Sequence, residues 1–247
     1  MITSKKILNQ YQDIYQFKGR VSNIYILIDK LKDSTYLVDC GLPSDSRHLI
    51  SLLHSFPPLK AIICTHFHVD HSSGWILLKN QFKNCLIYFH TNAKPFLFGE
   101  KRIPFPSFAS IKHILLPCMK DYHFFPNIKD LLFGGLYGTP FKKGFPLDRL
   151  YFFSDVSSIL PGFTTIHTPG HRPDSSSFLH IESGILISGD FIIAIKKKPL
   201  FNTYLSSVTN QIKSKEIIIS HLSNINYIYP GHGDIINIYP DLFYHMH

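Results

Sequence analysis

Residues 65–71, Thr-His-Phe-His-Val-Asp-His, constrain this chain more than any other stretch. They follow a run of four apolar residues that predicts a buried strand. His66 and His68 are two positions apart, so their side chains point to the same side of an extended chain. Asp70 and His71 are offset from that pair and could serve a second ion close by. Imidazoles and a carboxylate are ligands that zinc takes in open, hydrolytic sites, so the stretch predicts a metal site.

Three later stretches strengthen this interpretation, because together with the first they resemble the motifs of the metallo-β-lactamase-fold hydrolases. The resemblance is to the glyoxalase II-like branch in particular. The first stretch resembles the family's His-x-His-x-Asp-His motif, and the others are similar to its second, third and fourth motifs: Thr168-Pro169-Gly170-His171, Ser188-Gly189-Asp190 and Pro230-Gly231-His232-Gly233. All four occur in the family's order, and each follows an apolar, strand-like run. Four motifs in order are informative about fold and metal site and say little about the substrate.

The resemblance implies an α/β fold, an αββα sandwich in which two β-sheets are flanked by helices. We expect residues 1–247 to form one such domain, with an aromatic-rich cap inserted at about 92–155. The expected metal ligands divide into a first set, a second set and a bridging residue: His66, His68 and His171; Asp70, His71 and His232; and Asp190. Two Zn²⁺ ions per chain are expected, with iron or manganese as alternatives.

The chemistry implied by the resemblance is hydrolysis by a hydroxide that bridges the two metals. Two ions that share a water lower its pKa toward neutrality. Asp70 is the expected catalytic residue, because it can accept a hydrogen bond from the hydroxide and orient it. The favoured substrate is a thioester or related ester, as in hydroxyacylglutathione hydrolases. Those enzymes carry a C-terminal helical domain with basic residues for glutathione, which this chain is too short to contain. The run 196–198, three lysines, could substitute or could form a solvated loop.

Three other functions stay open at this point. Lactonases that act on acyl-homoserine lactones use the same seven ligands, but they place a Tyr three residues after the bridging Asp, where this chain has Ile193. Persulfide dioxygenase-like oxidoreductases keep the motifs and use a single iron held by two His and one Asp. A nuclease would suit the net charge of +8, since basic proteins bind nucleic acid, but neither the extra motifs nor a basic arm is visible. A small-molecule substrate is therefore expected rather than nucleic acid.

Composition agrees with a globular protein. The chain has 247 residues, and 45% of them are hydrophobic, which suffices for one large core. The four cysteines form no Cys-x-x-Cys pair, so buried free thiols in a reducing compartment are expected. No secretory signal and no apolar run of membrane-spanning length are visible, which predicts a cytoplasmic protein. A homodimer is an open alternative to a monomer.

Several elements follow from the residue pattern. Two or three strands are expected within residues 14–39, a helix over 44–56, a strand over 59–65, a helix over 75–82 and a strand over 86–90. Residues 177–181 and 184–188 are expected to pair as strands. A helix is predicted over 201–214, with four inward residues: Tyr204, Leu205, Val208 and Ile212.

The insert at about 92–155 is rich in proline and aromatic residues, so short helices are expected there rather than a long loop. These helices form either a cap beside the active site or a small satellite core or dimer contact.

Three residues beside the motifs each allow two interpretations. Asp39 either contacts the metal-site loops or caps a turn. His167 lies next to the second motif and either supports a ligand or is incidental. Arg172 could contact an anionic substrate, although a surface ion pair with Asp174 is favoured.

Overall fold

The computed structural model describes residues 1–103, 107–121, 130, 145–155, 158–239 and 242. Within them, a seven-stranded sheet runs in the order β1 (Ile2–Asn9), β2 (Gln12–Lys18), β3 (Asn23–Asp29), β4 (Ser34–Val38), β5 (Leu59–Ile63), β6 (Leu86–His90) and β7 (Leu150–Phe153). The strands β1 to β4 pair antiparallel, and β4 to β7 pair parallel. The parallel half needs crossover connections, and these carry the helices next to the site.

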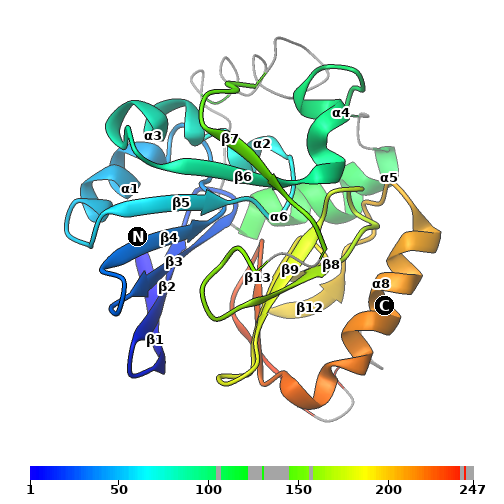
Figure 1. The fold of residues 1–247 in the computed structure, drawn as a ribbon. Helices are drawn as coiled ribbons and strands as arrows, with labels where there is room; N and C mark the ends of the chain where they lie inside the picture. The colour runs from blue at the N-terminus through cyan, green and yellow to red at the C-terminus, as the bar shows by residue number, and fades with distance from the viewer. Residues whose placement is uncertain (104–106, 122–129, 131–144, 156–157, 240–241, 243–247) are drawn as a thin grey trace.

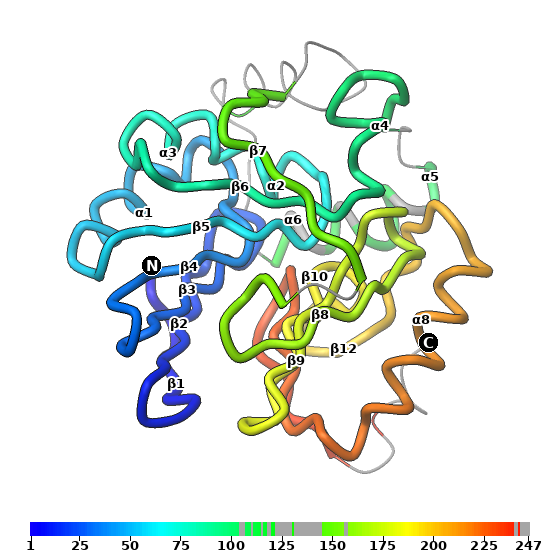
Figure 2. The backbone as a smooth tube through the Cα atoms, viewed as in Figure 1, coloured from blue at the N-terminus to red at the C-terminus, as the bar shows by residue number. Residues whose placement is uncertain are grey.

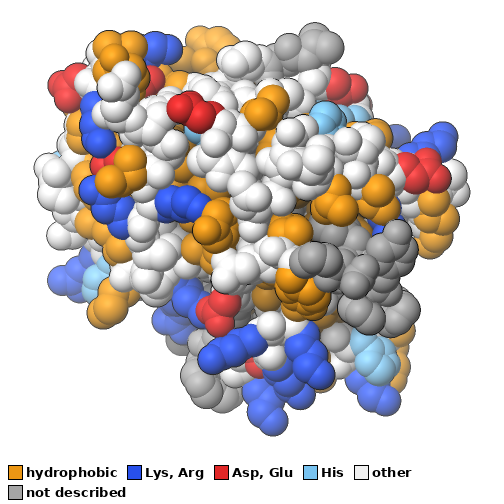
Figure 3. Space-filling model, turned by 90° about the horizontal axis from the view of Figure 1, so that it is seen from below, with side chains coloured by type: hydrophobic (Ala, Val, Ile, Leu, Met, Phe, Trp, Pro, Cys, Tyr) orange, Lys and Arg blue, Asp and Glu red, His pale blue; other side chains and the backbone are white. Residues whose placement is uncertain are grey.

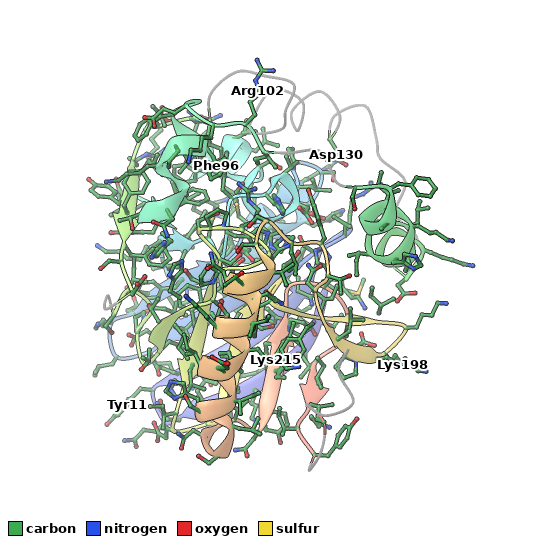
Figure 4. All side chains as sticks on the ribbon, turned by 90° about the vertical axis from the view of Figure 1, so that its right-hand side faces the viewer. Tyr11, Phe96, Arg102, Asp130, Lys198 and Lys215 are labelled. Carbon is green, nitrogen blue, oxygen red and sulfur yellow. The ribbon has the colours of Figure 1, made fainter. Side chains whose placement is uncertain are left out.

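A second sheet of five described strands faces the first. Its order is β14 (Ile236–Asn237), β13 (Tyr227–Pro230), β10 (Ile185–Gly189), β9 (Ser176–His180) and β8 (Thr164–His167). A separate hairpin joins β11 (Ile192–Ile195) to β12 (Lys198–Phe201). Lys196 and Lys197 form its turn, with φ of 50° and 63°, and their side chains are exposed. The lysine run is therefore a solvated hairpin turn, and Figure 4 shows Lys198 on this projecting hairpin.

Helices cover the outer faces of both sheets (Figure 1). They are α1 (Ser46–Leu53), α2 (Val69–Ser72), α3 (Trp75–Gln81), α4 (Lys94–Leu97), α5 (Phe108–Ser110), α6 (Leu116–Asp121) and α8 (Val208–Ser220). Short 3-10 turns are η1 (Thr91–Ala93) and η3 (Leu222–Asn224), and a π-helical turn is η2 (Ile111–Leu115). In Figure 1, α1 and α3 lie on one side of the molecule and α8 lies on the opposite side.

The core has layers because the strands alternate their side chains between two covered faces. In β3, Ile24, Ile26 and Ile28 pack with the residues of α1 and α3, whereas Tyr25 and Leu27 face the second sheet. A third cluster packs the outer face of the second sheet against α8. Every residue of β3 is buried, as expected for a strand with both faces covered. The predicted αββα architecture is confirmed.

One strand and one helix differ from expectation. The first strand, β1, was not predicted, and its alternating exposed and half-buried residues fit an edge strand. The helix predicted over 201–214 is correct only in its second half. Phe201 ends strand β12, residues 202–207 lie in neither helix nor strand, and α8 begins at Val208. There the Ser207 hydroxyl accepts a hydrogen bond from Asn210 N at 3.3 Å and caps the helix. Val208 and Ile212, expected inside, are 63% and 55% exposed.

Much of the expected insert at about 92–155 lies outside the described residues. Its final part is β7, which pairs with β6 in the large sheet, so these residues are not part of a cap. Leu97, Ile103 and Phe145 pack into the core beneath that sheet. Phe145 makes edge-on contacts with Phe67 and Phe89 at ring-centroid distances of 5.4 and 5.5 Å. Some apolar residues of the insert therefore complete the main core, and the cap itself stays a prediction.

Basic side chains lie on the surface. Figure 3 shows them spread over the face seen from below, with several gathered at its lower edge. Three cysteines, Cys40, Cys64 and Cys85, are buried free thiols, as predicted. Among the described residues, no helix is both long and apolar enough to cross a membrane.

Candidate metal centre

The first motif lies where β5 ends and α2 begins. After Ile63 the chain turns through residues 64–67, and His68 takes an extended conformation immediately before the helix (φ −125°, ψ 155°). His66 Nε2 and His68 Nδ1 come within 3.0 Å of each other. Asp70 and His71 follow in the first turn of α2. The chain changes from extended to helical conformation between the two histidines and the Asp-His pair. This change divides the motif into two pairs of side chains, as the spacing predicts.

Four of the seven predicted residues form one group. His66, His68, His171 and Asp190 each offer a ligand atom, and these atoms lie within 4.8 Å of one another. His171 Nε2 is 3.1 Å from His68 Nδ1 and 3.6 Å from Asp190 Oδ2. His171 arrives from the loop after β8, and Asp190 follows the last residue of β10.

The other three residues form an adjacent group. Asp70, His71 and His232 also offer ligand atoms within 4.8 Å of one another. The Nε2 atoms of His71 and His232 are 3.4 Å apart. Asp190 reaches this group too, with Oδ1 3.3 Å from His71 Nε2 and Oδ2 3.2 Å from His232 Nε2. The structure thus brings all seven predicted residues together, with Asp190 between the two groups.

Hydrogen bonds outside the centre fix the orientation of three imidazole rings. His71 Nδ1 lies 2.8 Å from Asp39 Oδ2, His171 Nδ1 lies 2.6 Å from the Tyr204 carbonyl oxygen, and His232 Nδ1 lies 2.6 Å from the Val21 carbonyl oxygen. Each of these Nδ1 atoms faces an acceptor and so carries the proton. When these three rings are neutral, their Nε2 lone pairs therefore point inward, the arrangement that metal-binding histidines adopt.

These lone pairs fit metal ions. Inside the centre, pairs of ring nitrogens lie 3.0–3.4 Å apart. In neutral rings, several of these nitrogens carry a lone pair and no proton, so they cannot all hydrogen-bond to one another. Asp190 Oδ1 is buried and accepts no hydrogen bond from the part of the chain that the structure describes. Converging acceptors in a buried space repel one another unless cations lie between them. The donor set, imidazole nitrogens with carboxylates, is the one that zinc and iron take.

The two groups differ in their electrostatics. Burial lowers the pKa of His171 to about 4, and burial with neighbouring histidines lowers the pKa values of His66 and His68 well below their usual value. These rings are neutral at pH 7. Burial also opposes charge on His71, but Asp190, Asp70 and Asp39 outweigh it and raise the pKa of His71 well above its usual value. One group is thus rich in neutral imidazoles and the other in carboxylate charge.

Asp39 contacts the metal-site loops, so that reading is confirmed. Besides His71, its carboxylate accepts hydrogen bonds from Thr65 N at 2.7 Å and from Thr65 Oγ1 at 2.9 Å. Its backbone lies in the left-handed region, with φ of 62°, and its side chain is buried. Asp39 therefore holds the first motif in place.

Arg172 and Asp174 are buried, at 2% and 0% exposure, so they form no surface ion pair. Arg172 Nε lies 3.9 Å from Asp174 Oδ1, and its guanidinium stacks over Phe96 at 4.2 Å. Figure 4 shows Phe96 on α4. Asp174 Oδ2 accepts a hydrogen bond from Phe67 N at 2.6 Å, which ties the loop of the second motif to the first motif.

Tyr204 is the neighbour of the centre that the sequence pattern did not reveal. Its ring stacks on His68 at 6.0 Å with an interplanar angle of 12° and meets His171 edge-on at 5.3 Å. It also packs against the apolar cluster that contains Ile193. Burial raises the pKa of Tyr204, so its hydroxyl keeps its proton at pH 7. The sequence predicts Tyr204 on the inner face of a helix, and no neighbouring residue signals its place beside the centre.

Both a family model and individual proteins are similar to this chain. The family model described as the metallo-beta-lactamase superfamily matches residues 18–232. A probable metallo-hydrolase of Methanocaldococcus jannaschii is 28% identical over 224 residues, which cover 88% of this chain and 90% of that protein.

Solved structures share the fold. The B3 metallo-beta-lactamase BLEG-1 is 23% identical to this chain, with a TM-score of 0.61. The match covers 93% of this chain and 96% of the BLEG-1 chain. The protein TTHA1623, solved in a di-iron-bound form, is 18% identical to this chain, with a TM-score of 0.59. The match covers 90% of this chain and 92% of the TTHA1623 chain.

Proposed function

This chain belongs to the metallo-beta-lactamase superfamily, and from that premise we propose that it is a binuclear metal-dependent hydrolase that cleaves a thioester or ester. The observation that carries the proposal is the convergence of seven acceptor side chains in two adjoining groups. The relatives named as probable metallo-hydrolases support metal-dependent hydrolysis. The narrower preference for a thioester rests on the resemblance of the four motifs to the glyoxalase II-like branch.

The proposed ligand assignment follows the two groups. His66, His68 and His171 would hold one ion, and the second would lie among Asp70, His71 and His232. Asp190 would contact both ions, since its two oxygens face both groups. Zinc suits this donor set, and iron suits it too.

When bound, such ions supply Lewis acidity, which activates water and polarises a carbonyl group. The side chain of Asp70 is 26% exposed, in contrast to 6% for Asp190. Asp70 therefore offers a carboxylate oxygen that a water entering the site can reach, and it would accept a proton from that water or orient it. Tyr204 keeps its phenol proton and lies beside His68 and His171, so it would donate a hydrogen bond to the substrate oxygen on which negative charge develops.

A nucleophilic cysteine is a poor alternative. Cys64 immediately precedes the first motif, but burial, together with the neighbouring Cys40, raises its pKa well above the usual value. The thiolate is the reactive form of cysteine. The attack on the carbonyl carbon is therefore assigned to water.

The lactonase is the second candidate, and Tyr204 favours it. The resembled lactonases place a tyrosine three residues after the bridging aspartate, and this chain has Ile193 there. Because Tyr204 packs against the cluster containing Ile193 and stacks on His68, its ring could supply the missing phenol from a different segment of the chain.

The first experiment is to count metal ions per chain by elemental mass spectrometry. The same preparation is then assayed with a thioester, an oxygen ester and a lactone that carry the same acyl chain. At least two ions per chain and fastest turnover of the thioester are expected. Faster turnover of the lactone would select the second candidate. A single iron with oxygen consumption would replace hydrolysis by a dioxygenase-like reaction.

Tyr204→Phe tests the proposed hydrogen-bond donor. Loss of one donor to a developing oxyanion lowers kcat by about 10²–10³-fold, so we expect a fall of that order with unchanged metal content. Tyr151→Phe is the matched control, because Tyr151 is 50% exposed on β7. An unchanged kcat in Tyr204→Phe would remove Tyr204 from the mechanism.

A further inference from the structure

A third group of potential ligands lies outside the centre described above. His90 ends β6, Asp155 follows β7 by two residues and His167 ends β8. Figure 2 shows β6 and β7 of the large sheet passing close to β8 of the second sheet. His90 Nε2 is 2.6 Å from Asp155 Oδ1, and His167 Nδ1 is 3.4 Å from the same oxygen. One ligand atom from each residue lies within 4.8 Å of the others.

The hydrogen bonds of His167 leave a lone pair facing this carboxylate. His167 Nε2 lies 2.9 Å from the Pro173 carbonyl oxygen, and because a carbonyl only accepts, Nε2 carries the proton. In the neutral ring, Nδ1 is then an acceptor, and it faces Asp155 Oδ1, which is another acceptor. Two acceptors stay this close only if a cation lies between them, and a metal ion or a second proton on the ring can fill that role.

We propose that His90, Asp155 and His167 form a third metal site, which takes a single divalent transition-metal ion such as zinc. Two imidazoles and one carboxylate form a zinc-binding set that leaves a position for water. The site is reachable, because the Asp155 side chain is 61% exposed while those of His90 and His167 are 3% and 18% exposed. The bond from His167 Nε2 to the Pro173 carbonyl is the kind of outer contact that orients a metal-binding histidine.

His90 must change tautomer to join the site. Its Nδ1 accepts a long hydrogen bond of 3.3 Å from Asn92 N, at the start of η1. An ion on Nε2 leaves the ring proton on Nδ1, so this hydrogen bond is lost. Asn92 is exposed, and water can satisfy the released N–H.

The ion would connect the two sheets near the second motif. Pro173 lies two residues after His171, and its carbonyl oxygen accepts hydrogen bonds from His167 Nε2 and from Asn92 Nδ2 at 3.1 Å. An ion held by strands of both sheets would fix the loop that carries His171. The proposal does not depend on the hydrolase function, because it concerns metal binding at a different group of residues.

Asp155→Asn tests the site directly. Asp155 is exposed, so the variant is expected to fold. Metal-free wild type and variant are loaded with excess zinc, passed through a desalting column and analysed for zinc per chain by elemental mass spectrometry. The wild type is expected to hold one ion more than Asp155→Asn. The matched control is Asp148→Asn, at another exposed aspartate, which pairs with Lys79 at 2.5 Å and should leave the count unchanged. The comparison is valid whatever the main centre holds, because all three proteins share it.

His167→Gln provides a second test. The amide nitrogen of glutamine can replace Nε2 as donor to Pro173, while the lone pair of Nδ1 is removed. Loss of one ion in this variant, with unchanged far-ultraviolet circular dichroism, would support a metal site. Equal zinc counts in wild type, Asp155→Asn and His167→Gln would overturn the proposal and identify the group as a hydrogen-bonded cluster only. Calorimetric titration with zinc should show the same difference of one binding event.

Discussion

Asp39 shows how a residue outside the ligand set shapes the candidate centre. Its two carboxylate oxygens contact His71 and Thr65, and together these contacts fix both ends of the first motif. Burial raises the pKa of Asp39, while His71 opposes that rise. The carboxylate makes the ring nitrogen on the opposite side of His71 a better donor to a metal.

Asp39→Asn should therefore weaken metal binding without removing a ligand. The amide lacks the negative charge, and only one of its two polar ends accepts a hydrogen bond. We expect metal affinity to fall by about 10–100-fold, measured by competition with a chromophoric chelator. Asp234→Asn is the control, since Asp234 is exposed and pairs with Lys18 at 3.0 Å. Equal affinities in the two variants would contradict the role given to Asp39.

The candidate ligands could be predicted from sequence because their residue types and spacing carry the signal. Tyr204 could not, because nothing in its neighbourhood distinguishes it from a core tyrosine. Its place beside His68 depends on the path of the chain after β12, and that path is set by contacts with distant segments. One of them is the hydrogen bond from His171 Nδ1 to the Tyr204 carbonyl oxygen.

At the scale of elements, α8 shows why an apolar pattern can mislead. Its inward residues are Gln211, Ser214 and Ile218, and two of these are polar because they bond to loops near the centre. Ser214 Oγ donates to the Pro169 carbonyl oxygen at 2.6 Å, and Gln211 Nε2 donates to the Asn202 carbonyl oxygen at 3.4 Å. The helix therefore buries a partly polar face, and Ile212 is left on the surface.

Two isoleucines on α8 provide a matched test of this orientation. Ile218 is 0% exposed and Ile212 is 55% exposed. Ile218→Ala should lower the free energy of unfolding by about 2–5 kcal/mol, because it removes buried methyl groups and leaves a cavity. Ile212→Ala should change it by about 0.5 kcal/mol or less, as surface substitutions do. Urea unfolding curves measure both, and a larger loss for Ile212→Ala would mean that the helix packs the other way round.

The strands were easier to predict than this helix. The interior of β3 and residues 61–63 of β5 are apolar on both faces, and both faces are buried there, so pattern and environment agree. The edge strand β1 lacks that agreement: most of its residues are exposed or half-buried, and its pairing with β2 gives it its structure. The local residue pattern thus predicts the buried strands of a sheet better than its edge strand.

At the scale of the whole molecule, the candidate centre lies where loops from the two sheets meet. The first motif follows β5 of the large sheet, and the other three motifs come from segments of the second sheet. Direct hydrogen bonds already connect them: Ser176 N donates to the Thr65 carbonyl oxygen at 2.9 Å, and Asn23 N donates to the Gly231 carbonyl oxygen at 2.8 Å. Bound ions would add to these contacts by neutralising the buried carboxylates of the centre.

Metal removal should therefore loosen the junction between the sheets and leave their interiors intact. An ion that binds only the folded state stabilises it by about 2.7 kcal/mol at 100 times its Kd, so Tm should fall after chelation and recover with zinc. Hydrogen–deuterium exchange should rise at residues 64–71, 168–174 and 230–233, because acceptor groups there repel one another without cations. Exchange in β3 (Asn23–Asp29), buried on both faces, should stay slow. If exchange rose equally in β3, the metal-free protein would be unfolding as a whole. The ions would then stabilise the entire fold rather than the loops of the centre alone.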